Sequence, residues 1–537
     1  MITTRFAPSP TGHLHIGGLR TALYSYLHAR AKNGKFLLRI EDTDTERNSK
    51  EALDGILEAF KWVGLEYDSP MLFQSERTPI YQQYAQKLLD SKHAYHCYLT
   101  KDELAAMRTQ NKGANHANCS RKYRDFIGEV PKDITPCVRI KAPLEGVISF
   151  EDGVKGNISF QASELDDFVI LRSDGTPTYN FVVAIDDALS GITDIIRGDD
   201  HISNTPKQLL VYKALGFDIP RFYHIPMICN EQGKKLSKRD GALSVLEYRD
   251  SGVLPEALLN FLFKLGYGHG DKEIFSLQEM IECFEPHRIN SNPSGCNFSK
   301  LYWLNAEYIK AMDNEKLAQL LNIENLKSTK SKTPTAEVFL DNFKGCADSC
   351  ARSLLDINDE TQEANSPKQT FLESAKKTTQ TLESLSNERK NILLNELKTR
   401  VNDLISMRNA IAQILNTPLT LESENMDKSQ QASYDKALYN KLFTQDTKAI
   451  LEQALSQFID KLQNATLNID STKSLIQEHA NNIANTFAIK PSIFMQALRL
   501  GLLGQKGGID LGACLCVLDK DESIKRIQNL IEFAETH

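Results

Sequence analysis

Residues 3–42, TTRFAPSPTGHLHIGGLRTALYSYLHARAKNGKFLLRIED, contain one complete supersecondary unit. The short apolar runs TTRFA and FLLRIED predict two strands, and the segment LRTALYSYLHARAKNG between them is apolar at helical spacing. We expect that helix to end at Asn33 and Gly34, which form a common stop signal. A strand, a glycine-containing turn, a helix and a second strand make a βαβ unit, which predicts a parallel sheet with a right-handed crossover.

The rest of the chain changes pattern twice. After a second helix at about 51–63, the range from about 73 to 187 mixes helices with short strands such as PCVRIKA and DFVILRS, as an inserted domain would. Strand and helix alternate again in ITDIIRG, a helix near 207–215 and FYHIPMIC. Beyond about residue 244 the periodicity is helical, and a stretch rich in Ser, Thr, Lys, Asn and Gln runs from about 322 to 389. That composition is typical of a loosely packed surface helix or a partly disordered insertion.

These patterns predict the α/β class, with a parallel nucleotide-binding sheet split by an inserted α+β domain and followed by an all-α C-terminal half. The expected ranges are 1–72 and 188–243 for the sheet domain, 73–187 for the insertion, 244–310 and 311–537 for two helical domains, and 322–389 for a polar insertion.

Length and composition set limits on the possible function. A chain of 537 residues is too long for one core, and 41% hydrophobic with 25% charged residues is ordinary for a soluble globular protein. No apolar run approaches the roughly 20 residues of a membrane span, and the first residues lack a secretory pattern. The ten cysteines are scattered, which favours a reducing cytoplasm. The net charge of −7 argues against unselective nucleic-acid binding, so we expect no DNA and no membrane partner, although a local basic surface stays possible.

The turn APSPTGHLHIGG leads into the first helix at the edge of the sheet where such folds bind ligands. Gly17 and Gly18 allow a backbone to approach closely, and the first N–H groups of the helix can bind phosphate. His15 could donate to a phosphate oxygen as charge builds during transfer. By itself this motif is equally consistent with an exposed histidine in an incidental turn.

A second candidate is the basic loop GKKLSKRDGA at 233–242. Lys235 and Lys238 could offset the charge of a pentavalent phosphate, with Ser237 holding the loop. The alternative is a solvated basic loop without a ligand.

Together the two stretches resemble the signature pair of the class I aminoacyl-tRNA synthetases. Within that class, TRFAPSPTGHLHIGGLRTAL, LLRIEDTD, TPTYNF, IIRGDDHISNTPKQ and KKLSKRDGA resemble the bacterial glutamyl-tRNA synthetases. The resemblance is dense over 1–310 and returns near the end in MQALRLGLLG and SIKRIQNLIEFA. It implies a Rossmann-type catalytic domain, an inserted domain for the tRNA acceptor end, and a helical anticodon-binding domain. Gly18 stands where the class motif has a second histidine, which the glutamyl group commonly lacks.

The resemblance also implies site residues. Arginines bind carboxylates through paired hydrogen bonds, so Arg5 and Arg197 suit an acidic amino acid, and Glu41 could accept from its ammonium group. A surface ion pair is the alternative for each. The implied glutamate pocket comprises Arg5, Ala7, Ser9, Glu41, Tyr179, Val183 and Arg197. The implied ATP site comprises His15, Gly17, Gly18, Asp200, His201, Ile228, Lys235, Ser237 and Lys238, of which His15, Lys235 and Lys238 are the expected catalytic residues.

The reaction implied is activation of L-glutamate by ATP with Mg²⁺, followed by transfer to the 3′ end of tRNA(Glu), with tRNA bound first. No covalent enzyme nucleophile is needed, so positioning and charge stabilisation carry the rate. Arg400 aligns with the arginine that relatives use at the last anticodon base, which predicts rejection of tRNA(Gln). The alternative for Arg400 is a charge on a solvated helix. We expect a monomer.

Some relatives bind zinc through Cys-x-Cys and Cys-x-His pairs in the insertion. Here Cys97 and Cys119 remain, but Leu99 and Arg121 stand at the partner positions. Structural zinc sites need four N or S ligands, and none of His93, His96 and His116 stands at a family position, so we expect no zinc.

The sequence leaves four alternative functions to compare with this one. A glutaminyl-tRNA synthetase would have β-barrels in its anticodon half, and a shortened paralogue that modifies a tRNA base would lack that half. A catalytically inactive tRNA-binding paralogue would not need His15, Lys235, Lys238, Arg5 and Arg197 together. An enzyme that also charges tRNA(Gln) stays open.

Overall fold

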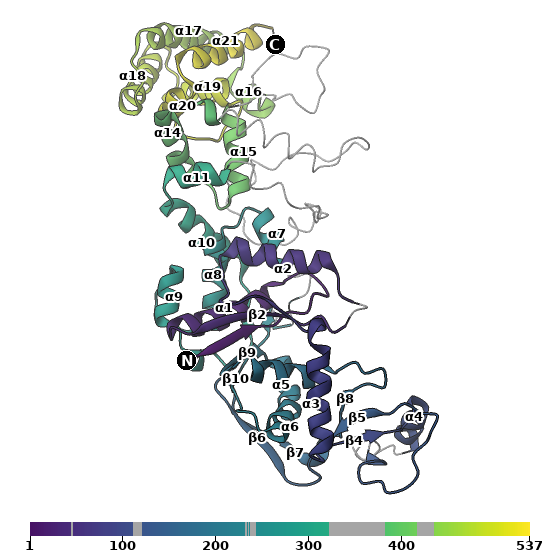
Figure 1. Ribbon diagram of the computed structural model, residues 1–537. Helices are drawn as coiled ribbons and strands as arrows, with labels where there is room; N and C mark the ends of the chain where they lie inside the picture. The colour runs from purple at the N-terminus through teal and green to yellow at the C-terminus, as the bar shows by residue number, and fades with distance from the viewer. Residues whose placement is uncertain are drawn as a thin grey trace. The chain divides into compact units, whose positions relative to one another are not determined.

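The computed structural model describes residues 1–44, 47–110, 121–230, 233–234, 236, 243–321, 382–415 and 434–536. Two compact units account for these residues (Figure 1). The first unit comprises Met1–Asp250 and Pro255–Leu301, and the second comprises Ser251–Leu254 and Tyr302–His537. None of the helices in the described ranges has the length and apolar character of a membrane span.

The predicted βαβ unit is confirmed at the start of the first unit. Strand β1 (Thr3–Phe6) leads through the turn into helix α1 (Ile16–Ala31), and strand β2 (Lys35–Ile40) pairs with β1 in parallel. The return from α1 to β2 passes so close to β1 that a Cβ atom on Gly34 would lie 2.1 Å from the carbonyl oxygen of Ile2. Residue 34, at the predicted end of the helix, must therefore be glycine.

The parallel sheet continues on both sides of β1. Strand β3 (Leu72–Phe73) pairs in parallel with β2, and β9 (Asp194–Gly198) pairs in parallel with β10 (Arg221–Ile225). The backbone N–H of Thr193 donates to the carbonyl of Thr3 at 3.0 Å, which places the start of β9 beside β1. The predicted α/β class with a parallel sheet is confirmed.

The range expected as an insertion contributes strands to two sheets. Strand β6 (Val147–Asp152) pairs with β10 at Asp152 and Phe222, and β7 (Gly156–Gln161) pairs antiparallel with β6. A separate antiparallel sheet consists of β4 (Ala94–Cys97), β5 (Cys137–Ile140) and β8 (Val169–Leu171). Farther along the chain, β11 (Ile228–Cys229) pairs with β12 (Ser294–Gly295). The hairpin β6–β7 thus brings Asp152 into the sheet that contains β9 and β10.

The remaining helices of the first unit pack around these sheets. Helices α5 (Tyr179–Leu189) and α6 (Thr205–Leu215) share one buried apolar cluster with β10 and β8. The helices are α2 (Lys50–Val63), α3 (Thr78–Asp90), α4 (Lys101–Gln110), α5 (Tyr179–Leu189), α6 (Thr205–Leu215), α7 (Val245–Asp250), α8 (Pro255–Lys264) and α9 (Leu277–Cys283), with short 3₁₀ turns η1 (Ser75–Arg77), η3 (Ala162–Glu164), η4 (Asp199–Asn204) and η6 (Pro286–Arg288).

Within its described residues the second unit contains helices joined by loops and no strand, which confirms the predicted all-α half. Its helices are the end of α10 (Phe298–Ala311), then α11 (Asn314–Leu321), α14 (Asn387–Lys398), α15 (Leu404–Leu415), α16 (Lys436–Leu442), α17 (Lys448–Asn464), α18 (Ile469–Phe487), α19 (Pro491–Leu503), α20 (Leu511–Leu518) and α21 (Lys520–Thr536). Every residue of helix α20 is buried. The polar segment expected at 322–389 lies outside the described residues as far as 381.

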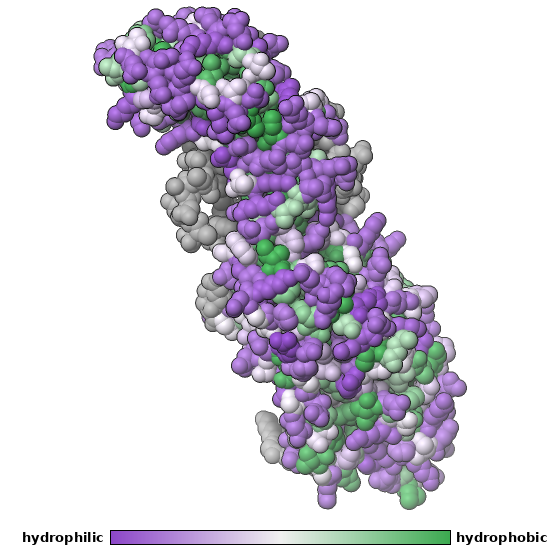
Figure 2. Space-filling model, turned by 90° about the vertical axis from the view of Figure 1, so that its left-hand side faces the viewer, coloured by the Kyte–Doolittle hydropathy of each residue, from purple (hydrophilic) through white to green (hydrophobic). Residues whose placement is uncertain are grey.

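Apolar side chains are mostly buried in both units. Figure 2 shows a largely hydrophilic face with small, separate apolar patches. Several of the large apolar side chains that are exposed lie in the range expected as an insertion: Phe126, Ile127, Val130, Leu144 and Val147.

A buried carboxylate links the start of β9 to its neighbours. Asp194 accepts hydrogen bonds from Arg221 Nη2 at 2.9 Å, from Thr193 Oγ1 at 2.7 Å and from His28 Nε2 at 3.1 Å. Burial alone would raise the pKa of Asp194, but the hydrogen bonds from His28, Arg221 and Thr193 outweigh burial and lower the pKa to about 2.

The low pKa of Asp194 predicts an acid-sensitive part of the stability. A carboxylate whose pKa is lower in the folded than in the unfolded chain stabilises the fold above the unfolded pKa, about 4 for aspartate. That stabilisation is lost as the pH falls from about 4 to about 2. Asp194→Asn should therefore be less stable than wild type at pH 7, and the difference should shrink over this interval. Urea denaturation at each pH measures it, and a constant difference would contradict the assignment.

Candidate active site

The turn before α1 holds His15 at the N-cap of the helix. Its Nδ1 accepts from the backbone N–H of Gly18 at 3.2 Å, so a neutral imidazole carries its proton on Nε2, the atom that can donate to a ligand. A Cβ on Gly17 would lie 3.0 Å from two atoms of the His15 ring. Gly17 is therefore needed for the histidine to lie over the first turn, in addition to the close backbone approach expected from sequence.

The residues expected to contact ATP come from two other segments. Asp200 and His201 lie on η4 directly after β9, and Ile228 lies on β11. Burial, together with the charge of Arg197, lowers the pKa of His201 to about 4, so this imidazole is neutral near pH 7. Lys235, Ser237 and Lys238 lie outside the described residues, but their neighbour Leu236 donates its backbone N–H to the carbonyl of Ile228 at 3.2 Å.

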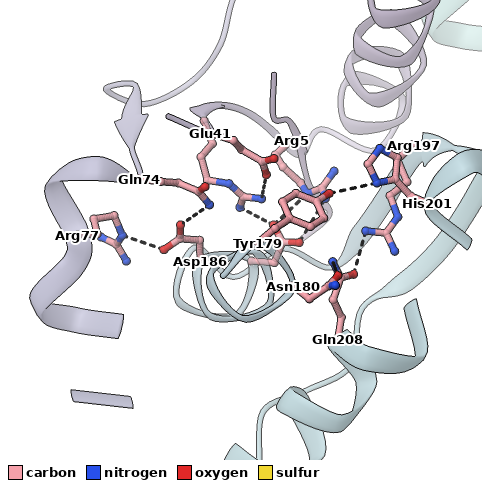
Figure 3. Close-up of polar contacts among 12 residues, drawn as sticks. Arg5, Glu41, Gln74, Arg77, Tyr179, Asn180, Asp186, Arg197, His201 and Gln208 are labelled. Atoms are coloured by element: carbon pink, nitrogen blue, oxygen red, sulfur yellow. Dashed lines mark hydrogen bonds and ion pairs between the residues drawn. The ribbon is translucent and has the colours of Figure 1, made fainter. Parts of the chain in front are cut away.

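A network of buried charges surrounds Arg5 (Figure 3). Arg5 donates through Nε to Asp187 Oδ1 at 2.9 Å and through Nη2 to Oδ2 at 3.3 Å. Arg39 donates to the same Oδ1 at 2.5 Å and to Glu41 Oε1 at 3.2 Å. Burial alone would raise the pKa of Asp187, but the charges of Arg39 and Arg5 outweigh it and leave the pKa below its usual value. Two arginines and two carboxylates thus balance one another.

Asp186, the neighbour of Asp187 on α5, ties the start of α3 to the same helix. Its carboxylate accepts from Gln74 Nε2 at 3.0 Å, from Arg77 Nε at 2.8 Å and from Tyr81 Oη at 2.7 Å. Asp186 is fully buried, and its charge is balanced by Arg77. The end of α5 therefore joins β1 and β2 on one side to η1 and α3 on the other.

Arg197, at the end of β9, has a different environment from Arg5. Its Nε donates to His224 Nε2 at 3.0 Å, its Nη1 to Gln208 Oε1 at 2.9 Å and its Nη2 to Thr205 Oγ1 at 2.8 Å. Its guanidinium carbon lies 5.5 Å from the centre of the Phe222 ring. Arg197 is 6% exposed, and burial is the main cause that lowers its pKa. Among the described residues no carboxylate forms an ion pair with Arg197, whereas Arg5 has Asp187.

The structure describes the surroundings of the other residues expected in the amino-acid pocket. The Oη of Tyr179, at the start of α5, lies 3.1 Å from His201 Nδ1 (Figure 3). The backbone N–H of Glu41 donates to the carbonyl of Pro8 at 3.0 Å, which brings the segment of Ala7 and Ser9 beside Glu41. Val183 is 1% exposed and lies in the apolar cluster shared by α5 and α6.

Sequence reasoning missed the residues that orient these side chains. Asp187, which also accepts from Arg39, orients Arg5, while Gln208, Thr205 and His224 orient Arg197. The available signals were charged residues inside apolar patterns, namely the arginine in FLLRI and the paired aspartates that follow FVVAI. Such signals indicate buried charges but not their partners.

The expected anticodon residue and the cysteines lie elsewhere. Arg400 follows α14, is exposed, and donates to Glu396 Oε2 at 3.2 Å. Cys97 is buried opposite Cys137 on β4 and β5, and Arg121 pairs with Asp167 at 3.4 Å. Cys119 and His116 lie outside the described residues, and within those residues no three metal-ligating side chains gather.

The chain matches two family models and is similar over nearly its full length to known proteins. Residues 1–303 match the family model for the catalytic domain of class I tRNA synthetases (E and Q), and 368–531 match that of an anticodon binding domain. The chain is 47% identical over 533 residues to glutamate–tRNA ligase 1 of Helicobacter hepaticus, covering 99% of this chain and 98% of the relative. It is 48% identical to glutamate–tRNA ligase 2 of Nitratiruptor sp., covering 99% of each. A crystal structure of a glutamate tRNA ligase from Elizabethkingia meningosepticum, in complex with its amino acid, is 27% identical with a TM-score of 0.76, covering 99% of each chain.

Proposed function

This chain belongs to the glutamate–tRNA ligases, within the class I tRNA synthetases of the glutamate and glutamine type, and we propose that the pocket around Arg197 binds L-glutamate for transfer to tRNA(Glu). The observation that carries the proposal is the charge balance of the site. Asp187 and Glu41 offset Arg5 and Arg39, and Asp186 offsets Arg77. Of the arginines that face this site, Arg5, Arg39, Arg77 and Arg197, only Arg197 has uncharged hydrogen-bond partners alone among the described residues.

A buried positive charge without an ion-pair partner favours an anionic ligand, because the ligand then supplies the missing compensation. Glutamate and glutamine differ only in the side-chain carboxylate, so Arg197 distinguishes them if it faces that group. We propose that Arg5 supports the same carboxylate, that Glu41 accepts from the α-ammonium, and that Ala7, Ser9, Tyr179 and Val183 line the rest of the pocket.

The proposed reaction has two steps on this site. The α-carboxylate of glutamate attacks the α-phosphate of ATP, supplied as its Mg²⁺ complex, and pyrophosphate leaves. The 2′-hydroxyl of the terminal tRNA adenosine then attacks the activated carbonyl and releases AMP. The N–H group of Gly17, the Nε2–H of His15 and the ammonium groups of Lys235 and Lys238 stabilise charge on the phosphates, while Gly18 holds His15 through its own N–H. Asp200, His201, Ile228 and Ser237 complete the proposed ATP site. We further propose a monomer that acts in the cytoplasm.

Charging assays with purified tRNA(Glu) and tRNA(Gln), labelled glutamate and ATP test this proposal, with glutamine as the control amino acid. Wild type should load glutamate onto tRNA(Glu) only. Arg400→Ala should weaken this discrimination about tenfold, since one arginine that reads a base contributes about 1–3 kcal/mol. Lys390→Ala, on the preceding helix, is the matched control and should leave discrimination unchanged.

Three other outcomes separate the alternatives. Loading of both tRNAs by wild type would keep the enzyme but contradict the role of Arg400. Loading of glutamine would contradict the charge argument for Arg197. Loading of neither amino acid would favour a tRNA-binding paralogue without activity.

A further inference from the structure

We propose that His224 and Asp152 form a positioning dyad that orients the Arg197 guanidinium, because Asp152 keeps the His224 imidazole protonated on Nδ1. The inference rests on the proposed function only in assigning glutamate to Arg197. The two residues come from distant parts of the chain, since Asp152 ends β6 in the hairpin beside the catalytic strands and His224 lies on β10. Both are buried, with 2% and 0% of their surface exposed.

Asp152 determines which nitrogen of His224 carries the proton. Its Oδ2 lies 2.6 Å from His224 Nδ1 and accepts the backbone N–H of His224 at 3.1 Å. Its Oδ1 accepts the backbone N–H groups of Val154 at 3.0 Å and Lys155 at 2.9 Å. A carboxylate that accepts this many donors is ionised, and an ionised carboxylate can only accept. His224 Nδ1 must therefore be the donor in the short contact.

The opposite nitrogen of His224 then faces Arg197 as an acceptor. Arg197 Nε lies 3.0 Å from His224 Nε2, and a guanidinium has no acceptor of its own. This hydrogen bond exists only while Nε2 has no proton. Burial lowers the pKa of His224, and the charge of Arg197 acts in the same direction against Asp152, so the imidazole stays neutral.

The dyad completes a three-point attachment of the guanidinium. The Nη1 and Nη2 atoms of Arg197 each bind one partner on α6, and Nε binds His224 on β10 (Figure 3 shows the contact with Gln208). These contacts use three of the five N–H bonds of an arginine. Within the described residues two N–H bonds are left for a substrate carboxylate, and His224 determines the plane in which they lie.

Asp152→Asn is the sharpest test because it keeps the shape of the side chain. Val154 and Lys155 both need an acceptor, so the amide oxygen should take the place of Oδ1 and the amide N–H₂ that of Oδ2. The amide would then donate to His224 Nδ1, the proton would move to Nε2, and an N–H would face the N–H of Arg197. We expect the KM for glutamate to rise about ten- to hundredfold, as for loss of a charge-assisted hydrogen bond, with little change in the KM for ATP.

Three further variants separate positioning from a general structural effect. Glu151→Gln makes the same chemical change on the adjacent, exposed residue of β6 and should leave every constant unchanged. His224→Gln supplies an amide oxygen that accepts from Arg197. Because this oxygen carries no proton in any state, the KM for glutamate should stay near that of wild type. In the double variant, His224→Gln should rescue most of the Asp152→Asn defect.

A spectroscopic readout tests the dyad without activity. In protein labelled with ¹⁵N histidine, the ring nitrogens of His224, assigned by their absence in His224→Gln, should show Nδ1 protonated in wild type and Nε2 protonated in Asp152→Asn. Nε2 protonation in wild type would overturn the proposal, even if Asp152→Asn failed to fold. A folded Asp152→Asn with a glutamate KM within twofold of wild type would also overturn it. Wild type that charges no glutamate would contradict the proposed function instead, while the spectrum would still decide the dyad.

Discussion

Arg197→Ala should reduce kcat/KM for glutamate in tRNA charging about a thousandfold. Removing one member of a buried, hydrogen-bonded charge pair costs about 2–5 kcal/mol, and a loss of about 4 kcal/mol corresponds to about a thousandfold in rate. The loss should be largest for glutamate, because the missing charge is the one that its side-chain carboxylate would compensate. The variant should consequently lose most of its preference for glutamate over glutamine as the bound amino acid.

Steady-state charging of tRNA(Glu) with varied glutamate, and inhibition of that reaction by glutamine, measure both effects. Arg47→Ala is the matched control, since Arg47 is an exposed arginine of the same unit that pairs only with nearby Asp44 among the described residues. A loss below about tenfold in Arg197→Ala would contradict the assignment of the carboxylate to this residue, because a contact that weak is ordinary for a solvated pair.

Asp187→Asn should lower the free energy of unfolding of the first unit by about 3–5 kcal/mol. Asp187 is 0% exposed and accepts from both Arg5 and Arg39, so its neutralisation leaves two buried guanidinium groups with only Glu41 to balance them. Breaking a buried ion pair from one side has a cost of this size, because the remaining charge stays buried without compensation. Arg5 would also lose its orienting partner, so binding of glutamate should weaken in the folded variant.

The two tryptophans make this measurement specific to one unit. Trp62 lies on α2 in the first unit and Trp303 lies in the second. In a Trp303→Phe background, urea denaturation followed by fluorescence therefore reports the first unit through Trp62. Asp54→Asn removes an exposed carboxylate of the same helix as Trp62 and should shift stability by less than about 0.5 kcal/mol. A similar small shift in Asp187→Asn would contradict the central role of that carboxylate.

The elements around the site were predictable because their signals are local. Apolar spacing in residues 3–42 specified a βαβ unit, and the glycine at its second turn is required by the 2.1 Å approach to Ile2. Helical periodicity in the C-terminal half had the same basis, since a period of about 3.6 residues is visible in any short window. The positions expected for Arg5, Glu41, Tyr179 and Arg197 in the pocket stay predictions, although the structure describes the surroundings of each.

The partners of those charges were not predictable from local pattern. Arg5 was expected to meet the substrate, but its guanidinium binds Asp187, which lies 182 residues farther along the chain. His224 reads as one polar residue in an apolar strand, and Asp152 as one acid before a turn, until β6 pairs beside β10. No periodicity connects such residues, because a hydrogen bond between side chains depends on which strands become neighbours.

The sequence by itself determined the α/β class, the helical C-terminal half and the identity of the charged residues near the first turn, since propensity and spacing act over a few residues. Only the tertiary structure decided which of those charges are already balanced. Burial makes an uncompensated charge costly. Which groups compensate each buried charge therefore depends on the side chains that the tertiary structure brings within hydrogen-bond distance. Arg5 forms an ion pair with Asp187, whereas Arg197 binds only uncharged partners in the described part of the chain, and the proposal that an anionic substrate binds at Arg197 rests on that difference.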